Sequence, residues 1–255
     1  MKKCIWCLQD ENHVPFLRLA HTVPQSLGGK NICLNVCDRC NSYFGNYDNK
    51  MPPIETVLKE VFNISRASFL HLSNEIGKNK AMARFSSSYF DVNFEKGHIK
   101  AKGSYKFQQD FQEQLGRQLK RGIYKMILEE IERQTKEGHL PKFDFIREYS
   151  RNNIGDLPLF YFDRKHGMIA MSLDWVKTPE IFIQDKRLNY LMKNESFLEI
   201  EFLGHVFGIV LSHDWDKNYA EYLELTKNIK SEFFNGFKIV KHFSDIDFTL
   251  QILKD

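Results

Sequence analysis

Four cysteines in two closely spaced pairs are the residues of this chain whose types and spacing most clearly indicate chemistry. Cys4 and Cys7 form one C-x-x-C pair, and Cys37 and Cys40 form the other. Two such pairs in one short segment are typical of a tetrahedral site in which four thiolates hold one Zn²⁺ ion. The sequence therefore predicts a structural zinc site with these four ligands. The fifth cysteine, Cys33, is expected to be a small buried residue, with its use as a replacement ligand as the alternative.

A zinc ion held by four cysteines has no open position, so any reaction needs other groups. His21 lies between the two pairs, and Asn41 directly follows the last cysteine. A neutral imidazole can accept a proton near neutral pH. The side-chain carbonyl of asparagine offers the oxygen ligand that a hard cation such as Mg²⁺ prefers. His21 and Asn41 are therefore the predicted reactive residues, and the predicted zinc site is their scaffold.

The order of these residues resembles the HNH endonuclease family, in its zinc-bound ββα-metal branch (His-Me finger, treble-clef type). The resemblance rests on the first cysteine pair, the pattern His21-x-x-Pro-x-x-Leu-Gly-Gly, and the second pair followed by Asn41-x-x-x-Gly45. It implies a metal-dependent endonuclease that hydrolyses phosphodiester bonds of DNA. It also implies that His21 is the general base and that Asn41 binds a catalytic Mg²⁺ or Mn²⁺. Restriction, phage defence or a mobile element is the setting that the family suggests.

One residue departs from the family pattern. The position before the histidine commonly holds an acid that ligates the metal, and here it is Ala20. The middle asparagine of the motif is either Asn31 or Asn35. Two alternatives follow. One is a zinc-finger module that binds nucleic acid after its catalytic centre has decayed, and the other is an effector nuclease that acts only with a partner or a signal.

Two short strands and a helix are expected to position these residues. Residues 16–21 are predicted to form a strand that Pro24 ends, and residues 31–36 form a second strand. The second cysteine pair is expected to begin a helix over residues 38–48. This strand, strand, helix order is the ββα arrangement that the resemblance requires.

A break at Met51-Pro52-Pro53 predicts a domain boundary, with a zinc module over residues 1–50 and an α+β domain over residues 51–255. The second domain is expected to select the target or to regulate the first. It is predicted to hold a mainly antiparallel sheet with helices packed against it. The expected helices cover residues 54–76, 111–137 and 218–230, the second of them ended by Gly138. The expected strands are a hairpin over residues 83–107 and the segments 159–162, 168–171, 181–183, 197–202, 206–211, 237–240 and 248–252.

Hydropathy favours a cytoplasmic protein, and its charge fits either a contact with DNA or an ordinary solvated surface. The net charge is +3, and it divides into +6 for residues 1–160 and −3 for residues 161–255 when Lys and Arg are counted against Asp and Glu. A basic first half suits contact with a phosphate backbone. Arg117, Lys120, Arg121 and Lys125 share one side of a predicted helix, as a DNA contact or as a solvated face. No apolar stretch is long enough for a membrane span, and a protein partner or a second copy is expected to bind through the second domain.

Overall fold

The computed structural model describes most of the chain as an α+β protein with antiparallel sheets, as the sequence predicts. The described residues are 1–46, 51–72, 86–93, 96, 98–102, 109–164, 173–183, 196–227 and 234–246. Expected strands at residues 168–171 and 248–252 lie outside these ranges. No helix among the described residues is long and apolar enough to cross a membrane.

The N-terminal part has the predicted ββα order, but its strands are short. Strand β1 (Ala20–His21) pairs antiparallel with β2 (Ile32–Cys33), and helix α1 (Asp38–Gly45) follows. The expected longer first strand does not form because the Asp38 carboxylate accepts the backbone N–H groups of Leu17 and Arg18. These two amides are therefore bound by a side chain and not by a neighbouring strand.

The main sheet has five strands in the order β6-β7-β8-β5-β9, and every neighbouring pair is antiparallel. The bounds are β5 Leu159–Arg164, β6 Phe182–Ile183, β7 Phe197–Phe202, β8 His205–Val210 and β9 Phe234–Ile239. A separate hairpin joins β3 (Phe90–Asn93) to β4 (His98–Ala101), as expected. β7 and β8 are buried along their whole length, so this part of the sheet lies in the core.

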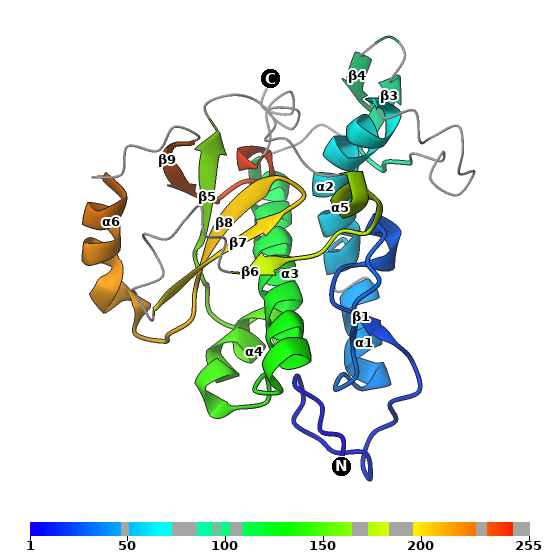
Figure 1. The fold of residues 1–255 in the computed structure, drawn as a ribbon, viewed down its shortest axis with the longest axis vertical. Helices are drawn as coiled ribbons and strands as arrows, with labels where there is room; N and C mark the ends of the chain where they lie inside the picture. The colour runs from blue at the N-terminus through cyan, green and yellow to red at the C-terminus, as the bar shows by residue number, and fades with distance from the viewer. Residues whose placement is uncertain are drawn as a thin grey trace.

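Helix α3 (Gln109–Thr135) is the central element, and it lies between the sheet and the N-terminal part (Figure 1). Apolar side chains at every fourth position of this expected helix are buried, at Leu115, Leu119, Ile123 and Ile127. The prediction that Gly138 ends the helix is wrong. Lys136 takes the left-handed backbone, with φ of 63°, and the helix ends at Thr135.

The remaining helices surround α3 and the sheet (Figure 1). Helix α2 begins at residue 54, as predicted, and packs along α3. Two short helices, α4 and α5, have no counterpart among the expected elements. The bounds are α2 Ile54–Leu72, α4 Asp144–Ser150, α5 Leu173–Lys177 and α6 Tyr219–Lys227, with 3₁₀ turns η1 Gln25–Leu27, η2 Pro141–Phe143, η4 Trp215–Asn218 and η5 Phe243–Asp245.

The expected boundary at residues 51–53 is packed against the helix core. Pro52 and Pro53 are buried, and the Pro52 carbonyl accepts a hydrogen bond of 2.9 Å from Gln118 of α3. One hydrophobic core runs from Trp6 and Phe44 to the residues of the sheet. Pro52 and Pro53 are thus not an exposed linker. The division into two domains stays a prediction.

Gly116 in α3 tests how tightly α3 packs. A Cβ at this position would lie 2.5 Å from the backbone oxygen of Lys241. Helix propensity alone favours Ala over Gly by about 1 kcal/mol, but overpacking costs about 1–3 kcal/mol. Gly116→Ala should therefore lower the free energy of unfolding, measured by denaturant titration. Gly45→Ala is the control, since its Cβ meets only the far end of Glu55 at 3.7 Å. Equal or higher stability for Gly116→Ala would contradict this packing.

Candidate metal centre and hydrolytic site

The four predicted zinc ligands lie together. The side-chain sulfurs of Cys4, Cys7, Cys37 and Cys40 are all within 4.8 Å of one another. The first pair sits in a tight turn, in which the backbone N–H of Leu8 bonds the Cys4 carbonyl at 2.9 Å. The second pair lies at the start of α1, for which Cys37 is the N-cap. The turn and the helix start therefore aim two thiols each at one point.

The donor set fits a zinc ion. Four sulfurs at about 2.3 Å from one Zn²⁺ form a tetrahedron with edges of about 3.8 Å, and the Cys7 and Cys37 sulfurs are 3.7 Å apart. The backbone N–H of Cys37 also points at the Cys4 sulfur, at 3.4 Å. A hydrogen bond between the Cys4 and Cys40 side chains lowers the pKa of Cys4 and raises the pKa of Cys40, so Cys4 gives up its proton more readily of the two.

Cys33 is not part of this cluster. It is buried on β2, opposite Ala20 of β1. Burial raises the pKa of its thiol far above the ordinary value, so Cys33 is an inert apolar residue there. The interpretation of Cys33 as a core residue is confirmed within the described structure.

His21 is the last residue of β1, directly opposite Ile32. It is half-buried, so part of the residue faces solvent. Its backbone carbonyl accepts a hydrogen bond of 2.9 Å from the Lys125 ammonium of α3. The next amide, that of Thr22, bonds the Asn31 carbonyl at 3.0 Å. Hydrogen bonds therefore hold both the carbonyl oxygen of His21 and the amide that follows it.

Asn41 stands in the first turn of α1, beside the same strand. Its side-chain nitrogen donates to the Leu19 carbonyl at 3.3 Å, and its backbone N–H bonds the Cys37 carbonyl at 2.9 Å. Among the described residues, no hydrogen bond engages its side-chain oxygen. The structure thus places the side chain of Asn41 against Leu19, two residues before His21.

The neighbouring motif residues differ in their burial and in their hydrogen bonds. Ala20 is buried, so an acid at this position would enter the core. The side-chain nitrogen of Asn35 donates to Glu132 of α3 at 2.5 Å. Asn31 is half-buried, and its backbone carbonyl bonds Thr22. Of the two candidates for the middle asparagine, Asn35 is therefore engaged with α3.

A buried ion pair of α3 lies on the interior side of the candidate site and contacts its backbone. Lys125 is 3.0 Å from Glu129 and 3.5 Å from Glu55, and the Lys125 and Glu129 side chains are 1% and 0% exposed. Glu129 also accepts the indole N–H of Trp6 at 3.0 Å. Burial raises the pKa of Glu129 to about 7. Burial acts to lower the pKa of Lys125, but Glu129 and Glu55 outweigh it and raise that pKa.

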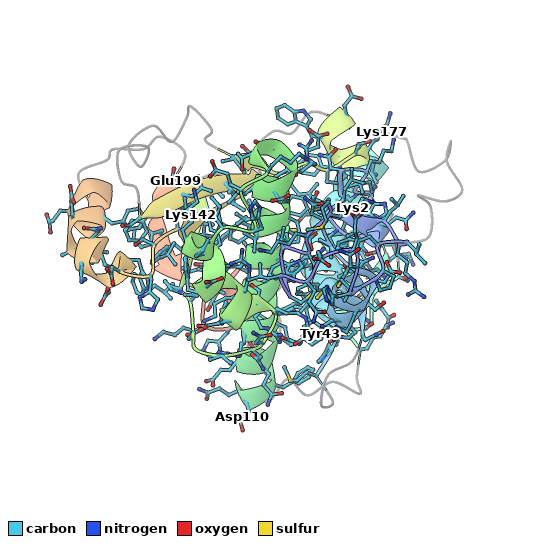
Figure 2. All side chains as sticks on the ribbon, turned by 90° about the horizontal axis from the view of Figure 1, so that it is seen from below. Lys2, Tyr43, Asp110, Lys142, Lys177 and Glu199 are labelled. Carbon is cyan, nitrogen blue, oxygen red and sulfur yellow. The ribbon has the colours of Figure 1, made fainter. Side chains whose placement is uncertain are left out.

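Other charged groups fasten the N-terminal part to α3 and α4. Arg121 donates to the hydroxyl of Tyr43 at 2.6 Å, and Arg147 of α4 donates to the carbonyl of Ile5 at 2.5 Å. Side chains fill the space between α3 and the segment that carries Tyr43 (Figure 2). Both interpretations of the basic side of α3, as a DNA contact or as a solvated face, are wrong for Lys120, Arg121 and Lys125, because all three are buried.

The supporting role of these residues was not predicted from the sequence, although the sequence contains a signal for it. Arg121, Lys125 and Glu129 follow one another at intervals of four, so they share one face of a helix. The same helix carries an apolar series on another face. A long charged face is ordinarily solvated, and the packing of residues 1–46, α2 and α4 against it makes it interior.

The zinc site predicts a defined metal content. Purified protein should contain about one Zn²⁺ per chain, and Cys37→Ser should lose the metal and the structure around it, because small cysteine sites fold only with metal. Metal analysis and circular dichroism measure both effects. Cys33→Ala is the matched control and should keep its zinc. Well-folded protein without zinc would contradict the four-cysteine site.

Comparison with protein families finds one match, to the family described as HNH endonuclease, over residues 4–51. Neither the curated proteins nor the solved structures contain a match to the chain. The matched residues include all four clustered cysteines, His21 and Asn41. The resemblance of residues 4–51 to the HNH endonuclease family is therefore confirmed.

Proposed function

We propose that this protein is a metal-dependent endonuclease that hydrolyses phosphodiester bonds of DNA. The observation that carries the proposal is the hydrogen bond from Asn41 to the carbonyl of Leu19, two residues before His21, beside a four-cysteine cluster and within a segment that matches the HNH endonuclease family. His21 is partly accessible, and the Asn41 oxygen has no hydrogen bond among the described residues. A base and an oxygen ligand are thus available on one small scaffold.

In this proposal His21 takes the proton from the water that attacks phosphorus. The carbonyl oxygen of Asn41 is the side-chain ligand for Mg²⁺ or Mn²⁺, which supplies charge stabilisation to the phosphate when bound. Ala20 offers no ligand. Water and phosphate oxygens therefore have to complete the coordination shell, which makes Asn41 more important than a ligand that shares its task with an acid.

The exposed charges of the N-terminal part support a nucleic acid as substrate. Its fully exposed charged residues are mostly cationic: Lys2, Lys3, Arg18, Lys30 and Arg39 against Glu11. Arg18 lies three residues before His21 and also donates to Ser42, at 3.2 Å, on α1. Exposed cations of this kind suit contacts with a phosphate backbone.

Lys125 is a positioning residue in this proposal. It touches neither water nor phosphate, but its ammonium bonds the carbonyl of His21 from the buried side. Its ammonium faces the carboxyl groups of Glu129 and Glu55, so the hydrogen bond to His21 lies within a buried cluster of charged groups. A base that is misplaced by a small displacement of its backbone loses much of its catalytic effect.

The proposed general base is tested by His21→Ala. Plasmid nicking with Mg²⁺ should fall by about 10²–10⁴-fold, because general-base assistance acts in the transition state. Zinc content and DNA affinity should stay at the wild-type level. His13→Ala is the matched control, since His13 is an exposed histidine of the same segment. Equal cleavage by wild type and His21→Ala would refute the role of His21. A wild type that binds DNA without cutting it would favour the decayed zinc-finger alternative.

The proposed role of Lys125 is tested with two variants of the buried ion pair. Glu129→Gln keeps the hydrogen bond from Lys125 to His21, whereas Lys125→Met with Glu129→Gln removes it. We expect kcat to fall about tenfold more in the double variant, since misplacement of the base weakens proton transfer. KM and zinc content should match those of the single variant. The NMR resonances of the His21 ring should shift in the double variant only. Identical kcat values and identical His21 resonances would show that Lys125 does not position the base.

A further inference from the structure

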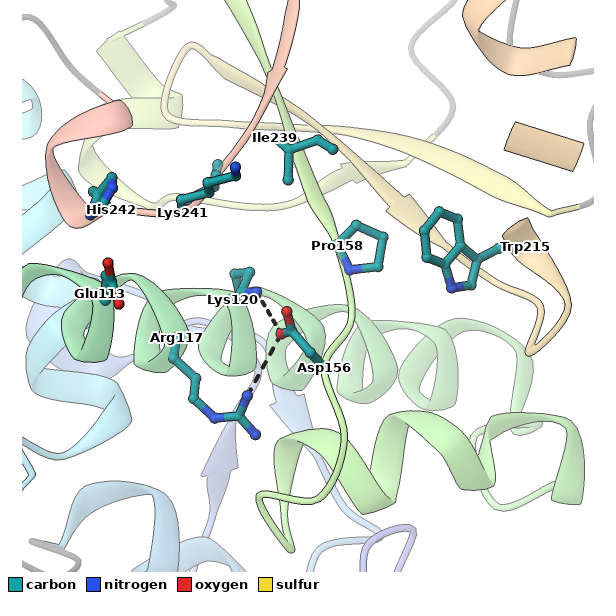
Figure 3. Close-up of a pocket in the computed structure, with 10 residues that line it drawn as sticks. Glu113, Arg117, Lys120, Asp156, Pro158, Trp215, Ile239, Lys241 and His242 are labelled. Atoms are coloured by element: carbon teal, nitrogen blue, oxygen red, sulfur yellow. Dashed lines mark hydrogen bonds and ion pairs between the residues drawn. The ribbon is translucent and has the colours of Figure 1, made fainter. Parts of the chain in front are cut away.

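A cavity of about 520 Å³ lies beside α3 (Figure 3), and none of the four clustered cysteines lines it. Its floor is the first half of α3, and its walls are the segment before β5, η4 and the end of β9 with the residues that follow. Small-molecule sites commonly have volumes of roughly 300–1,000 Å³. The cavity therefore has the size of a small-molecule site, and neither His21 nor Asn41 lines it.

The charged lining residues leave a positive surplus. Arg117, Lys120 and Lys241 oppose Glu113 and Asp156, which gives three positive and two negative charges and a net of +1. Asp156 is shared between two cations of α3, at 2.5 Å from Lys120 and 3.7 Å from Arg117. These two ion pairs are drawn in Figure 3. One carboxylate thus pairs with two cations at this end of the cavity.

Lys241 adds a cation on the opposite wall. Its residue is exposed, and in the described part of the chain no hydrogen bond or ion pair engages its ammonium. Figure 3 shows Lys241 above α3, on the far side of the cavity from Arg117 and Lys120. An anionic group between the two walls would therefore meet positive charge from both sides.

The rest of the lining is apolar and aromatic. Trp215 is partly buried, and its ring is held edge-to-face by Tyr219 with 5.6 Å between the centroids. Ile239 is 39% exposed, which is high for an apolar side chain at the wall of a cavity. A fixed indole beside an exposed aliphatic side chain suits a planar ring, because stacking gains contact area at little entropic cost.

The walls are fixed before any ligand binds. The Asp245 carboxylate accepts the backbone N–H groups of Lys241 and His242, at 3.0 and 2.8 Å. The absence of a side chain at Gly116 lets the Lys241 backbone approach α3 closely. Binding would therefore need little ordering of the Lys241 segment, and this favours affinity.

We propose that this cavity binds a small ligand that joins a planar ring to an anionic group, the class to which mononucleotides belong. The anionic group lies between Lys241 and Lys120, and the ring lies against Trp215. This site is separate from the proposed hydrolytic site, so it goes beyond the nuclease proposal. Both sites nevertheless contact α3, since Lys120 lines the cavity and Lys125 bonds His21.

Calorimetric titration of the full chain with adenosine monophosphate tests the proposal at low salt. Adenosine serves as the matched probe without the phosphate. Saturable binding of the monophosphate is expected with a Kd of about 1 mM or lower, and adenosine should bind at least about tenfold more weakly. The measurement involves no DNA and no cleavage, so its result does not depend on whether the protein is a nuclease.

Three variants locate the bound probe. Lys241→Gln and Trp215→Leu should each weaken the monophosphate about tenfold, by removing the cation and the stacking surface. Lys217→Gln is the matched control. It removes an exposed lysine that pairs with Asp214 on the same turn as Trp215 but does not line this cavity. Its affinity should equal that of the wild type.

Three results would overturn the proposal. The first is the absence of saturable binding of the monophosphate at concentrations of about 10 mM. The second is equal affinity for adenosine, which would exclude a role for the anionic group. The third is an equal loss in Lys217→Gln and Lys241→Gln, which would reduce the binding to general charge attraction at the surface.

Discussion

The buried ion pair of Lys125 and Glu129 is the interaction on which the N-terminal part of this structure depends. Two charges removed from water are costly unless both are paired and their remaining hydrogen-bonding capacity is used. The protein supplies partners from residues 1–46 and α2, while Glu129 Oε2 has the ion pair with Lys125 but no hydrogen bond among the described residues. The His21 carbonyl accepts from Lys125, the Trp6 indole donates to Glu129, and Glu55 adds a second negative charge. The partners from His21 and Trp6 are thus in place only when the cysteine-bearing segment is docked.

This dependence is mutual, because the segment is too small to fix its own strands. β1 and β2 each have two residues, and a short isolated hairpin is marginal in water. Zinc at the four cysteines would hold the turn of residues 4–7 to the start of α1. It would not reach the end of β1, where His21 lies. There the backbone is held by Ile32, by Thr22 bonding Asn31, and by Lys125 from α3.

Much of the local structure follows from the sequence for identifiable reasons. Paired cysteines at two-residue spacing, the series at Leu115 to Ile127 and the antiparallel strands after residue 158 are local patterns with one favoured outcome. The short strands could not be predicted, because Asp38 competes for the backbone of residues 17 and 18 from twenty residues away. Nor could the interior position of Arg121 and Lys125, since a charged helix face becomes core only through what packs on it. The cavity beside Trp215 depends on four segments that are separated in sequence.

The central claim is that α3 holds the end of β1, so that His21 is ordered only within the whole chain. Amide hydrogen exchange at Thr22, whose N–H bonds the Asn31 carbonyl, measures this directly in the full chain and in a zinc-loaded peptide of residues 1–50. The account predicts slow exchange in the full chain and nearly unprotected exchange in the peptide, even though the peptide binds zinc. Equal protection of Thr22 in both would contradict it, and would show that the zinc segment orders its hydrolytic strand alone.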